Sequence, residues 1–377
     1  KTNGRCKYLI VSGCLAQRYA RDLYAEIPEI DAIVGTEHYS DIVNIIRSLE
    51  NKHRPIVVDN SPYFIDKALP RILSTALPTA YLKIAEGCDN HCTYCIIPKI
   101  RGKYRSRHIE SLVEEAEHLV DNGVEELILV AQDVTAYGKD IDNNGTLIDL
   151  LKELCKISGL KWIRMLYCYP DYISDELLDL MYSQPKICKY LDIPIQHINS
   201  TILRKMNRHF TPDNIKYLLN KIRKIMPQAI IRTSLIVGFP GETENDFNEL
   251  CDFVREFEFN NLGVFSYSPE EGTPAAEYQE QIPETIKDQR RMELMSIQQK
   301  ISKKLNRQRI GQVCDVLIEG LDSPGVYFGR SYAEAPGIDG QIFVFSNKPI
   351  NIGSFVKVKI KKAYEYDLAG EAYEFSK

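Results

Sequence analysis

The spacing of apolar residues near the start of the chain predicts a small α/β unit. Strand-like runs at Tyr8–Val11 and Asp31–Val34 are each followed by a stretch with helical periodicity, at about residues 15–25 and 39–49. Two strand–helix units are few for an independent domain. We therefore interpret residues 1–62 as the remnant of an N-terminal α/β domain and expect a missing N-terminal segment, because the chain does not begin with methionine.

The next segment, 63–78, has weak periodicity and closely spaced prolines, which is typical of a linker. From residue 79 to residue 305, short apolar runs alternate with helical patterns. Such runs are expected for parallel strands that are covered on both faces. Six strand–helix repeats predict a partial (β/α)6 barrel with its functional loops at the carboxyl ends of the strands. The predicted strands are Tyr81–Ala85, Glu126–Gln132, Lys161–Tyr167, Tyr190–Ile195, Ile230–Val237 and Leu262–Tyr267.

The last part of the chain, 306–377, loses helical periodicity. Its apolar and β-branched residues form short runs, most of which are separated by Gly or Pro turns. Five strands in so short a segment predict a small β-barrel of OB-like size. The predicted strands are Val313–Ile318, Tyr327–Arg330, Gln341–Phe345, Ser354–Ile360 and Glu371–Phe375.

Composition fits a chain of two to three globular domains. Its 377 residues are 44% hydrophobic and 26% charged, which excludes disorder, collagen and coiled coil. No apolar run approaches the roughly 20 residues of a membrane helix. The net charge of −5 disfavours a globally basic nucleic-acid binder. Most of the ten cysteines are scattered, so we expect a reducing, cytoplasmic location rather than a disulfide framework.

Three of the cysteines, Cys88, Cys92 and Cys95, lie together directly after the first predicted barrel strand. Their C-x3-C-x2-C spacing fits one loop around a metal centre. Structural zinc takes four ligands, and a 4Fe–4S cluster normally takes four cysteines. Three thiolates on a 4Fe–4S cluster leave one iron open for a substrate or cofactor. The alternative is a zinc loop with His91 or His108 as the fourth ligand.

This cysteine loop and its place after the first barrel strand resemble the signature of the radical S-adenosylmethionine (AdoMet) superfamily. The resemblance implies that the open iron of the cluster binds the amino and carboxylate groups of AdoMet. It also implies that electron transfer then releases a 5′-deoxyadenosyl radical. Tyr94 occupies an aromatic position that superfamily members use to flank the cofactor, and the alternative for this ring is packing under the loop.

A second resemblance narrows the family. Residues Val11–Tyr19 are similar to the third cysteine segment of the methylthiotransferases, whose N-terminal domain holds a second 4Fe–4S cluster on three cysteines. Cys14 matches one of these ligands, whereas Cys6 matches neither of the others. The resemblance implies two clusters in the intact protein, one cluster in this chain, and a fragment that is inactive in sulfur insertion. The alternative for Cys14 is a small buried thiol.

Further motifs in the central part resemble the same family, and each lies on or just after the later part of a predicted strand. The resemblance implies that Gln132, Gln196, Arg232 and Ser234 point into the cavity as cofactor contacts, with Arg232 paired to the AdoMet carboxylate. A structural role is the alternative for each. The C-terminal barrel resembles a TRAM domain. The motifs are Ala131–Asp133 with Tyr137–Gly138, Asp192–His197, Arg232–Glu242 and Phe265–Pro274.

A basic run follows the cysteine loop. Between positions 99 and 107 there are five positive charges and no negative one. We therefore name Lys99, Arg101, Lys103 and Arg105 as candidate substrate contacts, which would meet tRNA phosphate or an acidic group elsewhere. The alternative is a solvated loop.

The methylthiotransferases have two branches, one acting on adenosine-37 of tRNA and one on an aspartate of ribosomal protein S12. The C-terminal domain has nine Lys/Arg and nine Asp/Glu, whereas an RNA-binding surface usually has a positive excess. Its lysine stripe, Lys357, Lys359 and Lys361, is as consistent with protection of an edge strand as with phosphate binding. Residues Cys88–Arg105 and Ala335–Gly340 resemble the S12 branch, so we expect S12 as the substrate and tRNA as the alternative.

The resemblance implies hydrogen abstraction from the β-carbon of the aspartate, followed by delivery of a methylthio group from the second cluster. Since that C–H bond is not acidic, the cofactor carries the difficult chemistry. The implied cofactors are AdoMet and 4Fe–4S clusters, and the implied partners are S12 and a reduced electron donor, with no membrane. Two further readings of the sequence stay open: a non-enzymatic, zinc-stabilised nucleic-acid adaptor, and an ordinary radical methylase or lyase.

Overall fold

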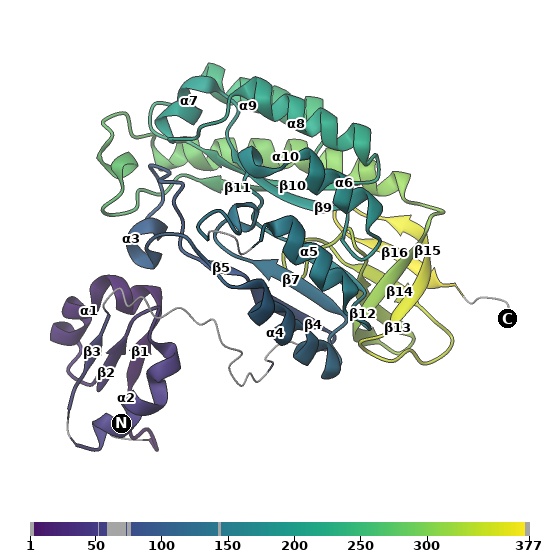
Figure 1. The fold of residues 1–377 in the computed structure, drawn as a ribbon. Helices are drawn as coiled ribbons and strands as arrows, with labels where there is room; N and C mark the ends of the chain where they lie inside the picture. Colours follow the sequence, from purple (N-terminus) through teal and green to yellow (C-terminus); the bar gives the residue numbers. More distant parts are fainter. Residues whose placement is uncertain (1–3, 52, 59–72, 74–76, 142–144, 374–377) are drawn as a thin grey trace.

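The computed structural model describes residues 4–51, 53–58, 73, 77–141 and 145–373. Figure 1 shows an N-terminal α/β unit, a central part built on parallel strands, and a C-terminal β-barrel. The N-terminal unit and the β-barrel lie at opposite ends of the central part (Figure 1). Nearly all of the predicted linker, 63–78, lies outside the described residues. No helix among the described residues has the length and apolar character needed to cross a membrane.

The N-terminal unit is a three-stranded parallel sheet with a helix on each face. Alternate residues of its central strand point to opposite faces, as strand geometry requires. Ile33 packs with one helix, whereas Ala32 and Val34 pack with the other. The elements are β1 (Ile10–Ser12), α1 (Cys14–Glu26), β2 (Ala32–Val34), η1 (Tyr39–Asp41), α2 (Ile42–Leu49) and β3 (Ile56–Val57), and the sheet order is β1-β2-β3.

The central part confirms the predicted partial barrel, with one difference in its strand pairing. Its parallel strands form two three-stranded sheets, in the orders β4-β7-β8 and β11-β10-β9. β8 and β9 lie beside each other. The Cys168 amide, in the segment that follows β8, donates to the carbonyl of Asp192 in β9 at 2.8 Å. The outer strands are β4 and β11, so the barrel is open between them. The strands are β4 (Thr79–Lys83), β7 (Glu126–Val130), β8 (Trp162–Met165), β9 (Tyr190–Gln196), β10 (Ile230–Val237) and β11 (Asn261–Ser266).

The predicted bounds are right for β10 and wrong for β4. β4 begins at Thr79, two residues before the predicted start at Tyr81. The reason is that the Pro78 carbonyl already accepts from the amides of Glu125 and Glu126, at 2.8 and 3.1 Å, so pairing with β7 starts immediately after the proline.

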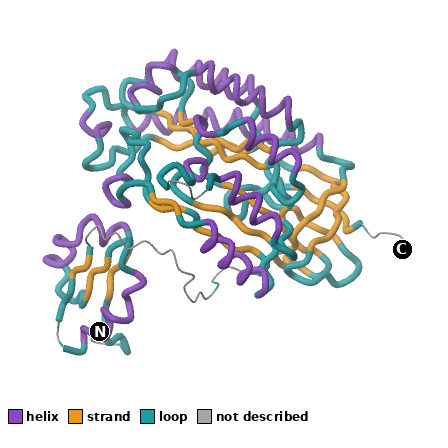
Figure 2. The backbone as a smooth tube through the Cα atoms, viewed as in Figure 1, coloured by secondary structure: helices purple, strands orange, loops and turns teal. Residues whose placement is uncertain are grey.

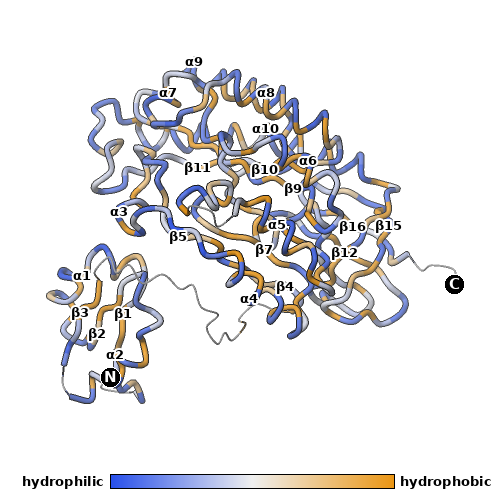
Figure 3. Tube along the Cα trace, viewed as in Figure 1, coloured by the Kyte–Doolittle hydropathy of each residue, from blue (hydrophilic) through white to orange (hydrophobic). Residues whose placement is uncertain are grey.

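Helices follow the strands and cover the outside of the sheets. Three of them begin with a capping box in which a Thr hydroxyl and the side chain three residues later satisfy the first amides: Thr146 with Asp149, Thr211 with Asn214, and Thr243 with Asp246. Figure 3 shows β7 as a largely hydrophobic segment beneath this layer. The elements are α4 (Ile109–Asp121), η2 (Val134–Ala136), α5 (Leu147–Lys156), η3 (Pro170–Tyr172), α6 (Asp175–Ser183), α7 (Ser200–Lys205), α8 (Pro212–Ile225), α9 (Glu244–Phe257), η4 (Pro274–Glu277) and α10 (Glu284–Gln308).

The C-terminal strands form a closed barrel, as predicted, and Figure 2 shows them in orange near the C-terminus. Their order in the barrel is β12-β13-β14-β16-β15. The last strand is not the predicted Glu371–Phe375. It begins at Leu368, which pairs with Ile342 and is buried in the barrel core, and residues 374–377 lie outside the described residues. The strands are β12 (Val313–Ser323), β13 (Val326–Arg330), β14 (Ile342–Phe345), β15 (Phe355–Ala363) and β16 (Leu368–Ala372).

A buried charge network attaches this barrel to the amino-terminal ends of β4 and β7. Glu126 accepts from Arg164 Nε at 3.0 Å, from Arg330 Nη2 at 2.6 Å and from the Thr79 hydroxyl at 3.0 Å. Burial opposes the charged carboxylate, but the two guanidinium groups outweigh it and lower the pKa of Glu126 to about 2. The C-terminal barrel is therefore fixed at the end of the strands opposite the carboxyl-end loops.

Candidate active site

The cysteine loop is held by backbone hydrogen bonds at the carboxyl end of β4. A short antiparallel pair, β5 (Ala85–Glu86) and β6 (Arg105–Ser106), frames it together with α3 (Ile97–Arg101). The Cys88 amide donates to the Gly102 carbonyl at 3.2 Å. Gly87 has φ of +85°, and a Cβ there would lie 2.1 Å from the Lys103 carbonyl oxygen, so only glycine fits. The local fold therefore fixes where the cysteines lie.

The three thiols of the loop are the candidate ligands of a shared cluster. Cys92 is buried, Cys88 and Cys95 are half-buried, and all three are free. Burial, with smaller contributions from the neighbouring cysteines, raises the pKa of Cys88 to about 11, and burial also raises that of Cys95. Burial disfavours the charged thiolates of Cys88 and Cys95, so bound positive charge would favour their ionisation. This donor set fits a 4Fe–4S cluster.

The zinc alternative finds no prepared site in the described part of the chain. No three His, Cys, Asp or Glu side chains there converge on the position of one metal ion. A 4Fe–4S cluster would not need the three thiolates to converge on one ion, because each thiolate would bind a different iron. Of the proposed fourth zinc ligands, His91 is exposed, and His108 lies at the N-cap of α4 as the sequence predicts.

Arg208 lies beside the cysteine loop and was not predicted. Its Nη1 is 3.5 Å from the Cys92 Sγ, and its guanidinium lies over the rings of Tyr169 and Phe210 at 4.3 and 4.8 Å. Tyr94 packs edge-on against Phe239 at 6.5 Å, and burial raises its pKa well above the usual value. The loop therefore has a buried positive charge next to Cys92. Arg208 lies in no motif that we recognised, so no pattern in the sequence pointed to it.

Two predicted cofactor residues lie at the carboxyl ends of the strands. Gln196 is the last residue of β9 and has φ of +72°, a strained backbone for a residue other than glycine. Gln132 follows β7 by two residues, and its Oε1 is enclosed with no hydrogen-bond partner among the described residues. An enclosed acceptor of this kind fits a bound ligand that brings a donor.

The other two predicted cofactor residues, Arg232 and Ser234, lie on the half-buried side of β10, where exposure alternates with every second residue. The expectation that they lie in the later part of the strand is wrong for Arg232, the third of eight residues. Its Nη1 donates to Asp192 at 2.7 Å, and its Nε is 3.8 Å from an oxygen of Asp339 in the C-terminal part. An AdoMet carboxylate would therefore compete with carboxylates that are already in place.

Glu242 holds the turn after β10. In the sequence it was noted only as the last residue of the motif Arg232–Glu242, with no role of its own. Its Oε2 accepts from the amides of Gly238 and Phe239 at 2.8 and 3.3 Å, and its Oε1 accepts from Arg290 at 2.8 Å. The Glu242 and Arg290 side chains are both buried. This carboxylate fixes the shape of the loop at the carboxyl end of β10.

The basic run makes contacts within the chain rather than presenting a free cationic surface. Lys99 Nζ donates to the Gly272 carbonyl at 2.6 Å, and Arg105 pairs with Glu37 of the N-terminal unit. Arg101 is likewise paired, whereas Lys103 is exposed and has no partner among the described residues. Of the four candidate substrate contacts, three already have intramolecular partners.

Cys14 contacts the basic run through Arg101. Arg101 Nη2 donates to its Sγ at 3.2 Å, while Arg101 Nη1 contacts both carboxylate oxygens of Glu86 at 3.0 Å. On the same side, Arg18 of α1 pairs with Glu270 and donates to the Glu271 carbonyl at 2.6 Å. The structure therefore brings Cys14 to the cysteine-loop end of the barrel.

Comparison with known proteins agrees with this arrangement. Residues 82–254 match the model of the radical SAM superfamily, and residues 310–372 match that of the TRAM domain. The ribosomal protein uS12 methylthiotransferase RimO of Desulforamulus reducens is 52% identical over 374 residues, 98% of this chain and 84% of that protein. The enzymes of the same name from Clostridioides difficile and Clostridium acetobutylicum are 49% and 48% identical, and each match covers 100% of this chain and 85% of the relative.

Such identity over nearly the whole length, together with the cysteine loop and the two matched domains, favours a methylthiotransferase over a zinc-stabilised adaptor and over an ordinary radical methylase or lyase. The chain belongs to the RimO family of ribosomal protein uS12 methylthiotransferases, which are radical SAM enzymes.

Proposed function

We propose that this protein adds a methylthio group to the β-carbon of an aspartate in ribosomal protein uS12. The observation that carries the proposal is the similarity of nearly the whole chain to enzymes named for uS12, combined with three free thiols in one loop. Radical SAM membership implies AdoMet and a 4Fe–4S cluster. When bound, these groups supply hydrogen-atom abstraction from an unactivated C–H bond, which no side chain can perform.

We propose Cys88, Cys92 and Cys95 as the ligands of the radical cluster and Cys14 as one ligand of a second cluster. The Arg101 contact supports the second assignment, because it holds the Cys14 thiol against the segment that follows the cysteine loop. Whether this chain carries one cluster, as the sequence predicts, is answered by iron and sulfide analysis.

For AdoMet we propose contacts from Tyr94, Gln132, Gln196 and Ser234, with Arg232 contributing positive charge deeper in the barrel. Gln132 has the strongest support, because its enclosed Oε1 has no donor within the described residues. A cavity of about 150 Å³ adjoins Cys88 and leaves room next to the cluster loop.

For the substrate we keep Lys103, whose ammonium group is exposed and free of partners in the described part of the chain. We assign Lys99, Arg101 and Arg105 to holding the loop and the N-terminal unit. We propose a cytoplasmic location, since a ribosomal protein is the proposed substrate, and a reduced electron donor as a further partner.

AdoMet cleavage in the presence of each candidate substrate tests the proposal. The reconstituted protein is incubated anaerobically with a reductant, AdoMet and either uS12 or tRNA, and 5′-deoxyadenosine is measured. We expect uS12 to increase its formation and tRNA to leave it unchanged. Stimulation by tRNA alone would overturn the substrate assignment. Mass measurement of uS12 tests separately the proposed addition of the methylthio group.

A further inference from the structure

The outer strand β11 has an unpaired edge. Among the described strands it pairs only with β10. Parallel strands are normally covered, and a free edge is a template for another strand. β11 is nevertheless only half-buried along most of its length, and Phe265 is 55% exposed. This edge borders the opening between β4 and β11, which is the side from which a large substrate would approach.

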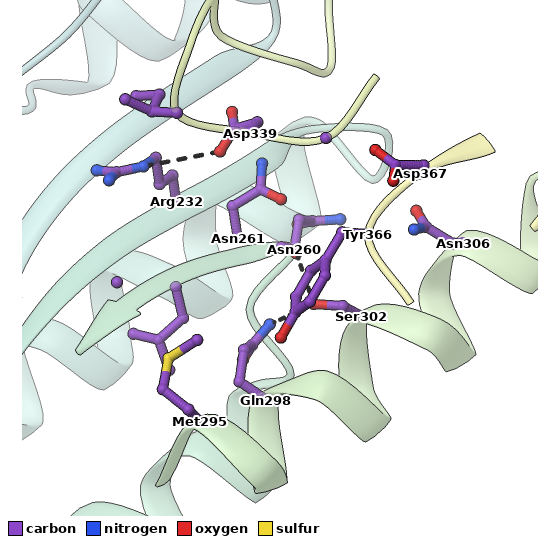
Figure 4. Close-up of a pocket in the computed structure, with 14 residues that line it drawn as sticks. Arg232, Asn260, Asn261, Met295, Gln298, Ser302, Asn306, Asp339, Tyr366 and Asp367 are labelled. Carbon is purple, nitrogen blue, oxygen red and sulfur yellow. Dashed lines mark hydrogen bonds and ion pairs between the residues drawn. The ribbon is translucent and has the colours of Figure 1, made fainter. Parts of the chain in front are cut away.

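A polar cavity of about 320 Å³ lies at the amino-terminal end of this edge. Figure 4 shows it between β11, helix α10 and the C-terminal part, with the side chains of Asn260, Asn261, Gln298 and Asn306 around it. Carboxamide side chains both donate and accept hydrogen bonds, as the peptide groups of a polypeptide do.

Gln298 is the most informative of these side chains. It is fully buried, and its Nε2 donates to the Phe259 carbonyl at 2.7 Å and to the Ser302 hydroxyl at 2.9 Å. These two bonds fix the orientation of the amide, and its Oε1 has no donor among the described residues. An enclosed acceptor in the wall of a cavity fits an occupant that brings an N–H group.

The other end of β11 leads to the cysteine loop. The six residues of the strand span about 20 Å. The segment that follows is tied to the loop, because Ala275 donates from its amide to the Thr93 carbonyl at 3.0 Å and Gly272 accepts from Lys99. A polypeptide laid along β11 would therefore reach from the polar cavity with its carboxamide side chains, called the carboxamide cavity below, to the proposed cluster ligands.

We propose that the substrate polypeptide binds in extended conformation along the free edge of β11, with one end in the carboxamide cavity and the residue to be modified near the cysteine loop. Main-chain hydrogen bonds to the edge give affinity, and side chains such as Phe265 give contact area. This inference rests on the proposed function, since a nucleic acid cannot form the ladder of amide hydrogen bonds.

Hydrogen exchange tests the ladder directly. Exchange of the full protein is followed by mass spectrometry with and without uS12, at a concentration that saturates the stimulation of AdoMet cleavage. We expect amides in peptides covering residues 261–266 to exchange at least about tenfold more slowly when uS12 is bound. Protection elsewhere with none at β11 would overturn the proposal while leaving the proposed function intact. Stimulation and protection by tRNA instead of uS12 would overturn both.

A pair of exposed aromatic residues provides a second test. Phe265→Ala removes contact area at the proposed edge, whereas Tyr217→Ala removes a ring that is 67% exposed on α8, away from the site. We expect Phe265→Ala to raise the KM for uS12 about tenfold with little change in kcat, because burial of an aromatic ring is worth about that much. Tyr217→Ala should match the unchanged protein. Equal KM values for the two variants would contradict the proposal.

Discussion

Arg101 donates to the Sγ of Cys14 at 3.2 Å and so joins the N-terminal unit to the segment that follows the cysteine loop. The same guanidinium contacts both carboxylate oxygens of buried Glu86, which fixes its direction. Together with the pairs Arg18–Glu270 and Arg105–Glu37, this contact forms a charged interface between two parts of the chain. Residues that the sequence assigned to substrate binding thus hold the two cysteine-bearing segments together.

Removing this guanidinium should loosen the N-terminal unit. Arg101→Ala deletes a hydrogen bond to Cys14 and leaves the Glu86 carboxylate with Lys83 as its remaining ion-pair partner among the described residues. We expect the interface to weaken by about 1.5–3 kcal/mol, the range for a hydrogen bond to a charged group. The measurement is hydrogen exchange in α1, which should accelerate. Arg21→Ala, an exposed arginine of the same helix, is the matched control. Unchanged exchange in α1 would show that Arg101 does not hold this unit.

The cluster assignment predicts a sharp difference between cysteines. Cys92→Ala should abolish AdoMet cleavage and lower the iron and sulfide content after anaerobic reconstitution, because a three-thiolate cluster loses one of its ligands. Cys155→Ala, which changes a half-buried cysteine of α5 far from the loop, should retain both. A Cys92→Ala protein that still cleaves AdoMet would refute the assignment, and one bound zinc in place of iron would restore the zinc alternative.

Arg208 should tune the cluster. A positive charge 3.5 Å from the proposed ligand Cys92 would stabilise the reduced, more negative state of the cluster. We therefore expect Arg208→Gln to lower the reduction potential, measured by a redox titration monitored by electron paramagnetic resonance. Arg204→Gln, an exposed arginine four residues earlier, should leave the potential unchanged. A purely structural role for Arg208 would affect folding without shifting the potential of the protein that does fold.

The Glu126 network should make the protein sensitive to acid. Its pKa is lowered to about 2 from an ordinary value of 4.5, so its carboxylate contributes stability above pH 4.5 and loses that contribution as the pH falls toward 2. The contribution at pH 7 is about 3 kcal/mol, from the size of the shift. We expect Glu126→Gln to unfold more readily in urea at pH 7, and the difference from the unchanged protein to shrink in acid. Glu153→Gln, on the surface of α5, is the control. A difference that does not depend on pH would contradict this assignment.

The pattern of hydrophobic residues predicted the architecture well, because short buried strands and capped helices carry strong local signals. β10 and the five-stranded barrel follow directly from such runs. The predicted bounds of β4 and of the last strand were displaced from the observed ones. The ends of these strands are set by pairing with residues distant in sequence, as Leu368 pairs with Ile342.

The sequence alone could propose the part of the site whose chemistry is local, but not the part that depends on tertiary contacts. The three loop cysteines lie within eight residues, so their spacing alone indicated a metal centre. Arg208 comes from a distant segment, and the partners of Arg101, Arg105 and Arg232 likewise lie far along the chain. A run of positive charge looks the same in sequence whether it faces solvent or pairs internally.

The most direct test of the central claim is transfer of deuterium from the substrate to 5′-deoxyadenosine. The reconstituted protein is incubated anaerobically with AdoMet, a reductant and uS12 that carries deuterium on the β-carbon of its aspartates, and 5′-deoxyadenosine is analysed by mass spectrometry. We predict deuterium in this product with labelled uS12 and none with unlabelled uS12. Cleavage of AdoMet without deuterium transfer from uS12, or transfer from deuterated tRNA instead, would contradict the account.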